Sequence, residues 1–228
     1  MRIWVTRTEP GATRLGDALR AAGHDAWVRP VLRVEHVSTP VPHGAFDLTV
    51  FLSEHAVRGA LANGWQRTPA LAIGPATRAA LDEHDIAAAI PEVASSEGIA
   101  AHLADTPPAR VLLATGEGGR DALPDLLGEQ GKAVIAWRLY RRLPVRDPLP
   151  AGPEIDAIVA GSAGGLRVAA DLWFASGRGG AVPLIVPSAR VAETARGIGF
   201  TRILVGPGAG VHATVATIGG MGRETRTP

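Results

Sequence analysis

Serine, threonine and glycine recur in this sequence where a short apolar run gives way to helix-forming residues. The stretch "VFLSEHAVRGAL" at 50–61 passes from apolar residues through a serine into such a segment, and "IVAGSAGGLRVAADL" at 158–172 does the same. A helix start offers unbonded backbone N–H groups and the positive end of the helix dipole, and both favour anions. These turns therefore predict the binding of an anionic ligand.

The candidate binding residues share this position between an expected strand and an expected helix. They are Arg7, Ser53, Thr77, Ser96, Gly116, Gly118, Gly119, Ser162 and Ser188. In an open parallel sheet, ligands bind at the carboxyl ends of the strands, where the helices begin. For each single serine or threonine the alternative is an N-cap that only stabilises its helix, by about 1 kcal/mol. The residues taken together indicate a site for a polyanion.

Several other kinds of site have no matching motif in the chain. The segment "GEGG" lacks the dinucleotide-binding spacing G-x-G-x-x-G, and "GPGAG" is not followed by the lysine and hydroxyl of a P-loop. The 7 histidines show no H-E-x-x-H or similar spacing, so no metal is expected. There is no cysteine, which excludes disulfides, cysteine–zinc sites and a thiol nucleophile.

Composition narrows the class of protein further. The chain has 228 residues and a formal net charge of +1, with 4% aromatic residues, so neither a basic surface nor stacking platforms for nucleic acid are expected. No apolar stretch approaches the roughly 20 residues of a membrane span. The amino-terminal segment lacks the apolar core of a signal peptide, so we expect a cytoplasmic protein without a membrane partner.

Short apolar runs alternate with amphipathic segments along the first half of the chain. The expected strands are 2–7, 25–30, 46–52, 70–74 and 87–91, and the expected helices are 12–23, 54–64, 75–85 and 95–104. Gly23 is a candidate C-cap, and Pro75 is expected at a helix start. Strands separated by helices predict parallel sheets with right-handed crossovers.

The second half of the chain repeats the order of the first. Residues 110–137 align with residues 2–29 at an offset of 108 (110 − 2), with matching arginine, glycine and leucine positions. Ser162 and Ser53 continue the match at an offset of 109 (162 − 53). Any two strand–helix units share hydrophobicity, but they do not share glycine, serine and arginine positions. The pattern therefore predicts an internal duplication of domain-sized units.

Two segments depart from the strand–helix rhythm. Residues 31–38 and 138–145 alternate apolar and polar side chains, which is typical of half-buried strands. Proline-rich segments follow both of them. We interpret them as a pair of linker strands between two α/β lobes.

The chain resembles the uroporphyrinogen-III synthase family over nearly its full length. The resemblance rests on the order and spacing of "VTRTEPGATRLGDALRAAG" (5–23), "FDLTVFLSEHAVRGAL" (46–61), "AIGPATRAAL" (72–81), "ASSEGIAAHL" (94–103), "LLATGEGGRDALPDLLGEQG" (112–131), "RLYRRLP" (138–144) and "IDAIVAGSAGGLR" (155–167). It implies an α/β fold of two flavodoxin-like parallel-sheet lobes joined by a two-stranded β-ladder linker. Lobe 1 is expected at 1–32 plus 147–228, lobe 2 at 39–137, and the linker strands at 33–38 and 138–146.

The resemblance also implies an activity, namely a lyase reaction in tetrapyrrole biosynthesis. Family members cyclise hydroxymethylbilane, a linear tetrapyrrole with eight carboxylates, with loss of water and inversion of the last pyrrole ring. The pyrroles supply the electrons, so no cofactor is expected. The only tyrosine, Tyr140, is the candidate general acid, and Ser53, Thr77 and Ser162 are implied to lie at the substrate.

Two other functions remain open at this point. A two-lobed sensor that binds a small anionic molecule without turnover needs the same strand-end turns, and a product assay on hydroxymethylbilane separates it from the enzyme. A nucleotide-sugar transferase with two lobes is disfavoured by the short chain and by the absence of an acidic sugar-nucleotide motif. In each case we expect a monomer with a small-molecule partner.

Overall fold

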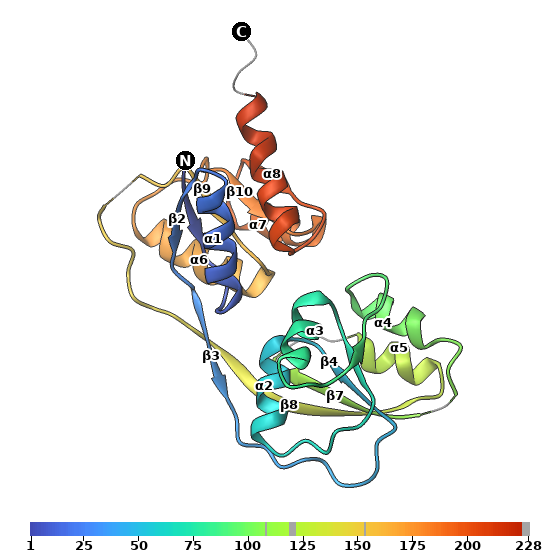
Figure 1. The fold of residues 1–228 in the computed structure, drawn as a ribbon. Helices are drawn as coiled ribbons and strands as arrows, with labels where there is room; N and C mark the ends of the chain where they lie inside the picture. Colours follow the sequence, from blue (N-terminus) through green and yellow to red (C-terminus); the bar gives the residue numbers. More distant parts are fainter. Residues whose placement is uncertain (108, 119–121, 153, 225–228) are drawn as a thin grey trace. The chain divides into compact units, whose positions relative to one another are not determined.

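The computed structural model describes residues 1–107, 109–118, 122–152 and 154–224, and these form two compact units. Unit 1 comprises Met1–Arg33 and Leu143–Pro228, and unit 2 comprises Val34–Arg142 (Figure 1). Unit 1 is therefore discontinuous in sequence. The chain leaves it along strand β3 (Leu32–His36) and returns to it along strand β8 (Ala133–Pro144).

Unit 1 contains a five-stranded sheet in the order β11-β10-β9-β1-β2, and all of its neighbouring strands are parallel. The strands are β1 (Arg2–Val5), β2 (Asp25–Val28), β9 (Ala157–Val159), β10 (Leu184–Val186) and β11 (Ile203–Val205), and the helices are α1 (Gly11–Ala21), α6 (Ala163–Ala175), α7 (Ala189–Ile198) and α8 (Val211–Glu224). Buried side chains lie on both faces of this sheet, as expected for parallel strands covered by helices.

The two faces of the unit 1 sheet build separate cores. Trp4 points to the face covered by α6 and α7, where its indole packs 6.3 Å from that of Trp173. Its neighbours Ile3 and Val5 point to the other face, where they pack with residues of α1 and α8. Successive side chains of a strand point to opposite faces, so one short apolar run supplies both cores.

Unit 2 contains a six-stranded sheet in the order β3-β8-β7-β4-β5-β6. Its other strands are β4 (Leu48–Phe51), β5 (Ala70–Ala72), β6 (Ala88–Ala89) and β7 (Arg110–Gly116), and its helices are α2 (Glu54–Ala62), α3 (Pro75–Asp82), α4 (Ser96–Leu103) and α5 (Leu123–Glu129). The pairs from β8 to β6 are parallel. Helices α2 and α3 cover the face of Phe51, and α4 and α5 cover the face of Val50.

The two sheets have related strand orders. The order β2-β1-β9-β10-β11 in unit 1 is the flavodoxin order 2-1-3-4-5, and β8-β7-β4-β5-β6 has the same form if β7 is taken as the first strand. The order reverses direction between β1 and β9 in unit 1, and between β7 and β4 in unit 2. These reversals are the topological switch points at which open α/β sheets bind ligands.

The predicted fold class, two flavodoxin-like parallel-sheet lobes, is confirmed, while the internal duplication stays a prediction. One difference concerns β8, which is a single strand of 12 residues that includes both the segment after α5 and the expected linker strand. Gly23 follows the end of α1 with a φ of 83°, and Pro75 is the first residue of α3. No helix among the described residues is long and apolar enough to cross a membrane.

Candidate functional site

The carboxyl ends of the parallel strands bring the candidate residues of unit 2 to one edge of its sheet. Gly116 ends β7, Ser53 follows β4, Gly74 follows β5 and Ser95 follows β6, in the spatial order of those strands. Ser53 and Gly116 thus flank the switch point between β4 and β7. Helices α2, α3 and α4 begin directly after Ser53, Gly74 and Ser95, so their unbonded backbone N–H groups lie along the same edge.

Tyr140 of β8 joins this edge through two hydrogen bonds to its hydroxyl group. Ser53 Oγ donates to Tyr140 Oη over 3.0 Å, and Arg142 Nη2 donates to the same oxygen over 2.8 Å. Ser53 Oγ in turn accepts the backbone N–H of Ala56, at 3.1 Å, as the N-cap of α2. A strand residue, a helix cap and a guanidinium therefore meet at one phenolic oxygen.

The ring of Tyr140 is enclosed, with 2% of the residue exposed. The imidazole of His55 lies 5.4 Å from the phenol ring and that of His36 lies 6.4 Å from it, between ring centroids. Gly116 lies against the ring so closely that a Cβ atom there would come within 2.5 Å of Tyr140 Cε2. The backbone N–H of Glu117 donates to the Tyr140 carbonyl over 2.7 Å and holds the two strands together.

This arrangement suits proton donation from a fixed position. A phenolic hydroxyl has one proton to give and can accept hydrogen bonds at its oxygen. Both bonds to Tyr140 Oη are accepted, so its proton is available to a third group. A general acid must lie within hydrogen-bond reach of the atom it protonates, and a hydroxyl whose direction is set by its neighbours meets that requirement without reorganisation.

The remaining candidates of unit 2 differ in their surroundings. Thr77 is the third residue of α3 and only 4% exposed. Ser96 is the first residue of α4, whereas its neighbour Ser95 is the N-cap and accepts the Gly98 N–H at 3.0 Å. Gly118 has a φ of 76°, in the left-handed region that favours glycine. Gly119 lies outside the described residues.

In unit 1 the candidates lie at the equivalent edge. Ser162 caps α6 and accepts the Gly165 N–H at 3.2 Å, so the N-cap reading is confirmed for it as for Ser53. Ser188 takes the N-cap position of α7 without a side-chain cap bond. Arg7, just beyond β1, donates from Nη1 to the carbonyl of Ala209 over 2.6 Å, and this bond ties it to the loop after β11.

Three residues of the Tyr140 cluster were missed by the sequence analysis, namely His36, His55 and Arg142. The period of two along an alternating strand was a usable signal for Arg142, because it puts residues 140 and 142 on the same face. No sequence signal linked the two histidines to Tyr140, since they come from β3 and α2. Among the described residues, no group of three His, Cys, Asp or Glu side chains could hold a metal ion.

The fold and the site define a class of protein: an α/β chain of two parallel-sheet units, each with helix starts and hydroxyl groups at its switch point. Residues 13–216 match the family model described as uroporphyrinogen-III synthase HemD. This chain therefore belongs to the uroporphyrinogen-III synthase family, whose members are enzymes of tetrapyrrole biosynthesis.

Solved structures with the same fold carry the same family name. A mutant uroporphyrinogen III synthase from the extremely thermophilic bacterium Thermus thermophilus is 18% identical and matches over 99% of both chains, with a TM-score of 0.59. The uroporphyrinogen-III synthetase of Helicobacter pylori is 14% identical and matches over 96% of this chain and 98% of its own, with a TM-score of 0.60. At these identities the two structures support the two-lobed fold.

Proposed function

We propose that this protein is a uroporphyrinogen-III synthase that cyclises hydroxymethylbilane to uroporphyrinogen III with loss of water. The observation that carries the proposal is the family match over residues 13–216. In this reaction hydroxide leaves the hydroxymethyl carbon to give an azafulvene, and the substituted carbon of the terminal pyrrole attacks it. The resulting spiro intermediate fragments and recloses with that ring inverted. The enzyme must favour this closure over the direct head-to-tail closure.

Tyr140 is the proposed general acid for the departure of hydroxide. Two hydrogen bonds support this role. Tyr140 Oη accepts both of them, from Ser53 and from Arg142, so the phenolic proton is left to face the leaving oxygen. Protonation turns the leaving group into water, and the pyrrole nitrogen supplies the electron pair that expels it. Loss of the N–H proton from that nitrogen then gives the neutral azafulvene, so that the net change is the loss of water. The electrons come from the substrate, so the proposed reaction needs no cofactor.

The carboxylates of the substrate are proposed to bind at the helix starts. Support comes from the N-terminal ends of α2, α3 and α4 in unit 2 and of α6 and α7 in unit 1, which all follow the carboxyl ends of parallel strands. Backbone N–H groups at such ends bind anions with the aid of the helix dipole. The proposed side-chain contributors are Arg7, Thr77, Ser96, Ser162 and Ser188, and Gly116, Gly118 and Gly119 are proposed to contribute backbone N–H groups at the end of β7 and after it. Ser53 is proposed to contribute through the start of α2 that it caps, because its hydroxyl proton is donated to Tyr140 Oη.

Product analysis tests the proposal directly. The purified protein is mixed with hydroxymethylbilane, the products are oxidised to porphyrins, and the type I and type III isomers are separated by chromatography. We expect the type III isomer, formed in proportion to enzyme concentration. Formation of the type I isomer alone, at the rate seen without protein, would contradict the enzyme and favour the alternative of an anion-binding sensor without turnover.

A further inference from the structure

The hydroxyl group of Tyr140 is contacted by two side chains from different elements. Arg142 lies on the same strand β8, and Ser53 is the N-cap of α2. Both contacts are within the normal range of hydrogen bonds, at 2.8 Å and 3.0 Å. One of the two contacts has only one possible direction: a guanidinium carries donors and no acceptor, so Arg142 must donate to the phenolic oxygen.

In the structure the Ser53 contact runs from the serine to the phenol. Ser53 Oγ donates its proton to Tyr140 Oη while it accepts the N–H of Ala56. The phenolic oxygen then accepts twice, and the single phenolic proton cannot turn toward either neighbour.

We propose that Arg142 and Ser53 are positioning residues that occupy the acceptor positions of Tyr140 Oη and thereby direct its proton at the bound substrate. The orientation follows from this chain's contacts alone, whereas its catalytic consequence rests on the proposed function. A tyrosine without these two donors would rotate its proton among several partners, and each rotation away from the leaving group would be unproductive.

The ring itself is held by other contacts, so removing Arg142 should not displace it. Gly116, His55 and the buried core around β8 lie against the phenol ring, and the N–H of Glu117 holds the backbone of Tyr140 in place. Arg142 is exposed, and its guanidinium carbon lies 5.0 Å from the centroid of the ring while its Nη2 contacts the hydroxyl. A loss of activity in a folded Arg142 variant would therefore come from the hydroxyl and not from a collapsed core.

The neighbouring Arg141 provides a matched control. It is also exposed and on β8, but the alternation of the strand turns it to the other face, where it forms an ion pair with Glu35 of β3. Arg141→Met thus removes the same charge and the same length of side chain as Arg142→Met. It leaves the Tyr140 hydroxyl with both donors.

Raman spectroscopy of the free protein tests the orientation without substrate. The tyrosine doublet near 850 and 830 cm⁻¹ reports whether a phenol accepts or donates hydrogen bonds, and Tyr140 is the only tyrosine in the chain, so the signal has one source. We expect an acceptor-type ratio in the wild type, and a shift toward the donor-type ratio in both Arg142→Met and Ser53→Ala. Arg141→Met should keep the wild-type ratio.

The Ser53→Ala variant tests which hydroxyl group donates in the hydrogen bond between Ser53 and Tyr140. If Tyr140 instead donated to Ser53, removal of the serine would move the doublet further toward the acceptor type, and that opposite shift would overturn the proposal. An unchanged doublet in Arg142→Met would also overturn it. These results stand even if the protein does not cyclise hydroxymethylbilane, so a failure of the orientation and a failure of the proposed function are distinguishable.

A double-mutant cycle tests the catalytic consequence. Loss of a hydrogen bond to a charged donor should lower kcat by about ten- to a hundredfold in Arg142→Met, with a smaller change in KM. In the Tyr140→Phe background the same substitution should cause no further loss, because there is no hydroxyl to direct. Arg142→Lys should restore part of kcat. An equal loss in both backgrounds would show that Arg142 acts independently of Tyr140.

Discussion

Gly116→Ala should disturb the Tyr140 site through a single methyl group. A Cβ atom at residue 116 would lie 2.5 Å from Tyr140 Cε2, 2.6 Å from Cζ and 3.0 Å from Cδ2. Carbon atoms pack at about 3.5–4.0 Å, so the ring or strand β7 would have to move by roughly 1 Å. Gly116 does not have a positive φ, and the effect is therefore steric.

The size of the effect follows from the tightness of the core around the ring. Overpacking a well-packed interior by one methyl group typically costs about 1–3 kcal/mol. If the ring moves away from the new methyl group, the 3.0 Å bond from Ser53 and the 2.8 Å bond from Arg142 are also lengthened. We therefore expect both a lower free energy of unfolding and a lower kcat, with the tyrosine Raman doublet shifted toward the donor type.

Urea denaturation and steady-state kinetics measure the two effects on the same protein. The control is Gly128→Ala in helix α5, where a Cβ atom would meet nothing within 4 Å. Alanine is favoured over glycine inside a helix by about 0.5–1 kcal/mol, so the control should be as stable as the wild type or more so. Wild-type stability and kcat in Gly116→Ala would refute the reasoning that this glycine makes room for the phenol.

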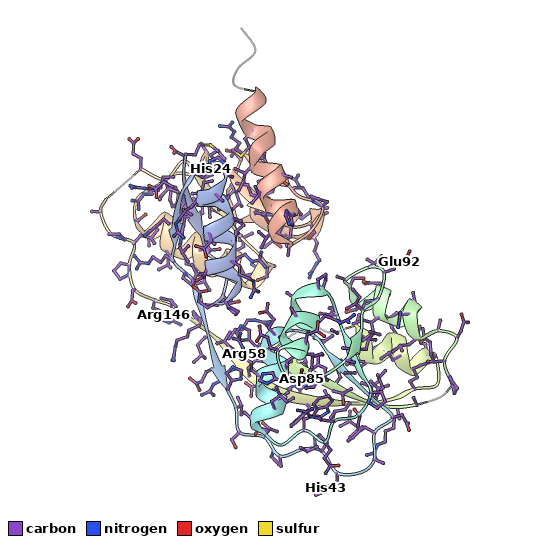
Figure 2. The ribbon with its side chains drawn as sticks, viewed as in Figure 1. His24, His43, Arg58, Asp85, Glu92 and Arg146 are labelled. Carbon is purple, nitrogen blue, oxygen red and sulfur yellow. The ribbon has the colours of Figure 1, made fainter. Side chains whose placement is uncertain are left out.

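Other predictions concern the hydroxyl groups, one further glycine and one histidine. Tyr140→Phe should fold, lose about 0.5–1.5 kcal/mol of stability in urea, and lower kcat by about 10²–10⁴-fold if the hydroxyl is the acid; unchanged turnover would remove that role. Ser162→Ala should cost about 0.5–2 kcal/mol of stability as a lost N-cap, measured by urea denaturation. Gly118→Val should cost at least about 1–2 kcal/mol in the same measurement, because its φ of 76° is strained for a β-branched residue. His24, after α1 (Figure 2), has a pKa below the ordinary 6.5 because of burial and, to a smaller extent, the charged amino terminus. The unfolded chain therefore binds this proton more readily, so stability is full above about pH 6.5 and falls as the pH drops below it. His24→Gln should weaken the loss of stability between about pH 7.5 and 5.5, and an identical pH dependence would contradict the prediction.

The architecture could be predicted because it depends on local patterns. Apolar runs such as 46–52 become strands covered on both faces, and the proline at residue 75 and the glycine at residue 23 mark helix ends. These signals lie within a few residues of the features they specify. The serines after β4 and β9 were likewise recognised as helix starts, and the structure confirms Ser53 and Ser162 as N-caps.

Which residues meet at the candidate site depends on contacts between segments that lie far apart in the sequence. Local sequence patterns do not reveal these contacts. Gly116 was expected among the anion-binding residues between a strand and a helix, and the register of β7 and β8 places it opposite Tyr140, with an irregularity between Thr115 and Gly116. Because Gly116 has no side chain, the ring of Tyr140 from strand β8 can pack directly against it. Strand register of this kind follows from the packing of the whole sheet and not from the local sequence.

The two switch points show which part of the site is specific to unit 2. Ser53 and Ser162 have nearly the same backbone conformation, with φ and ψ of −171° and 163° in one case and −161° and 161° in the other, and each caps its helix through one N–H. Their capping is therefore a property of the strand–helix turn that both units share. Of these two serines, Ser53 is the one that also contacts the tyrosine. A turn that stabilises its helix in both units thus becomes part of the proposed catalytic group in one of them, because strand β8 brings Tyr140 and Arg142 to it.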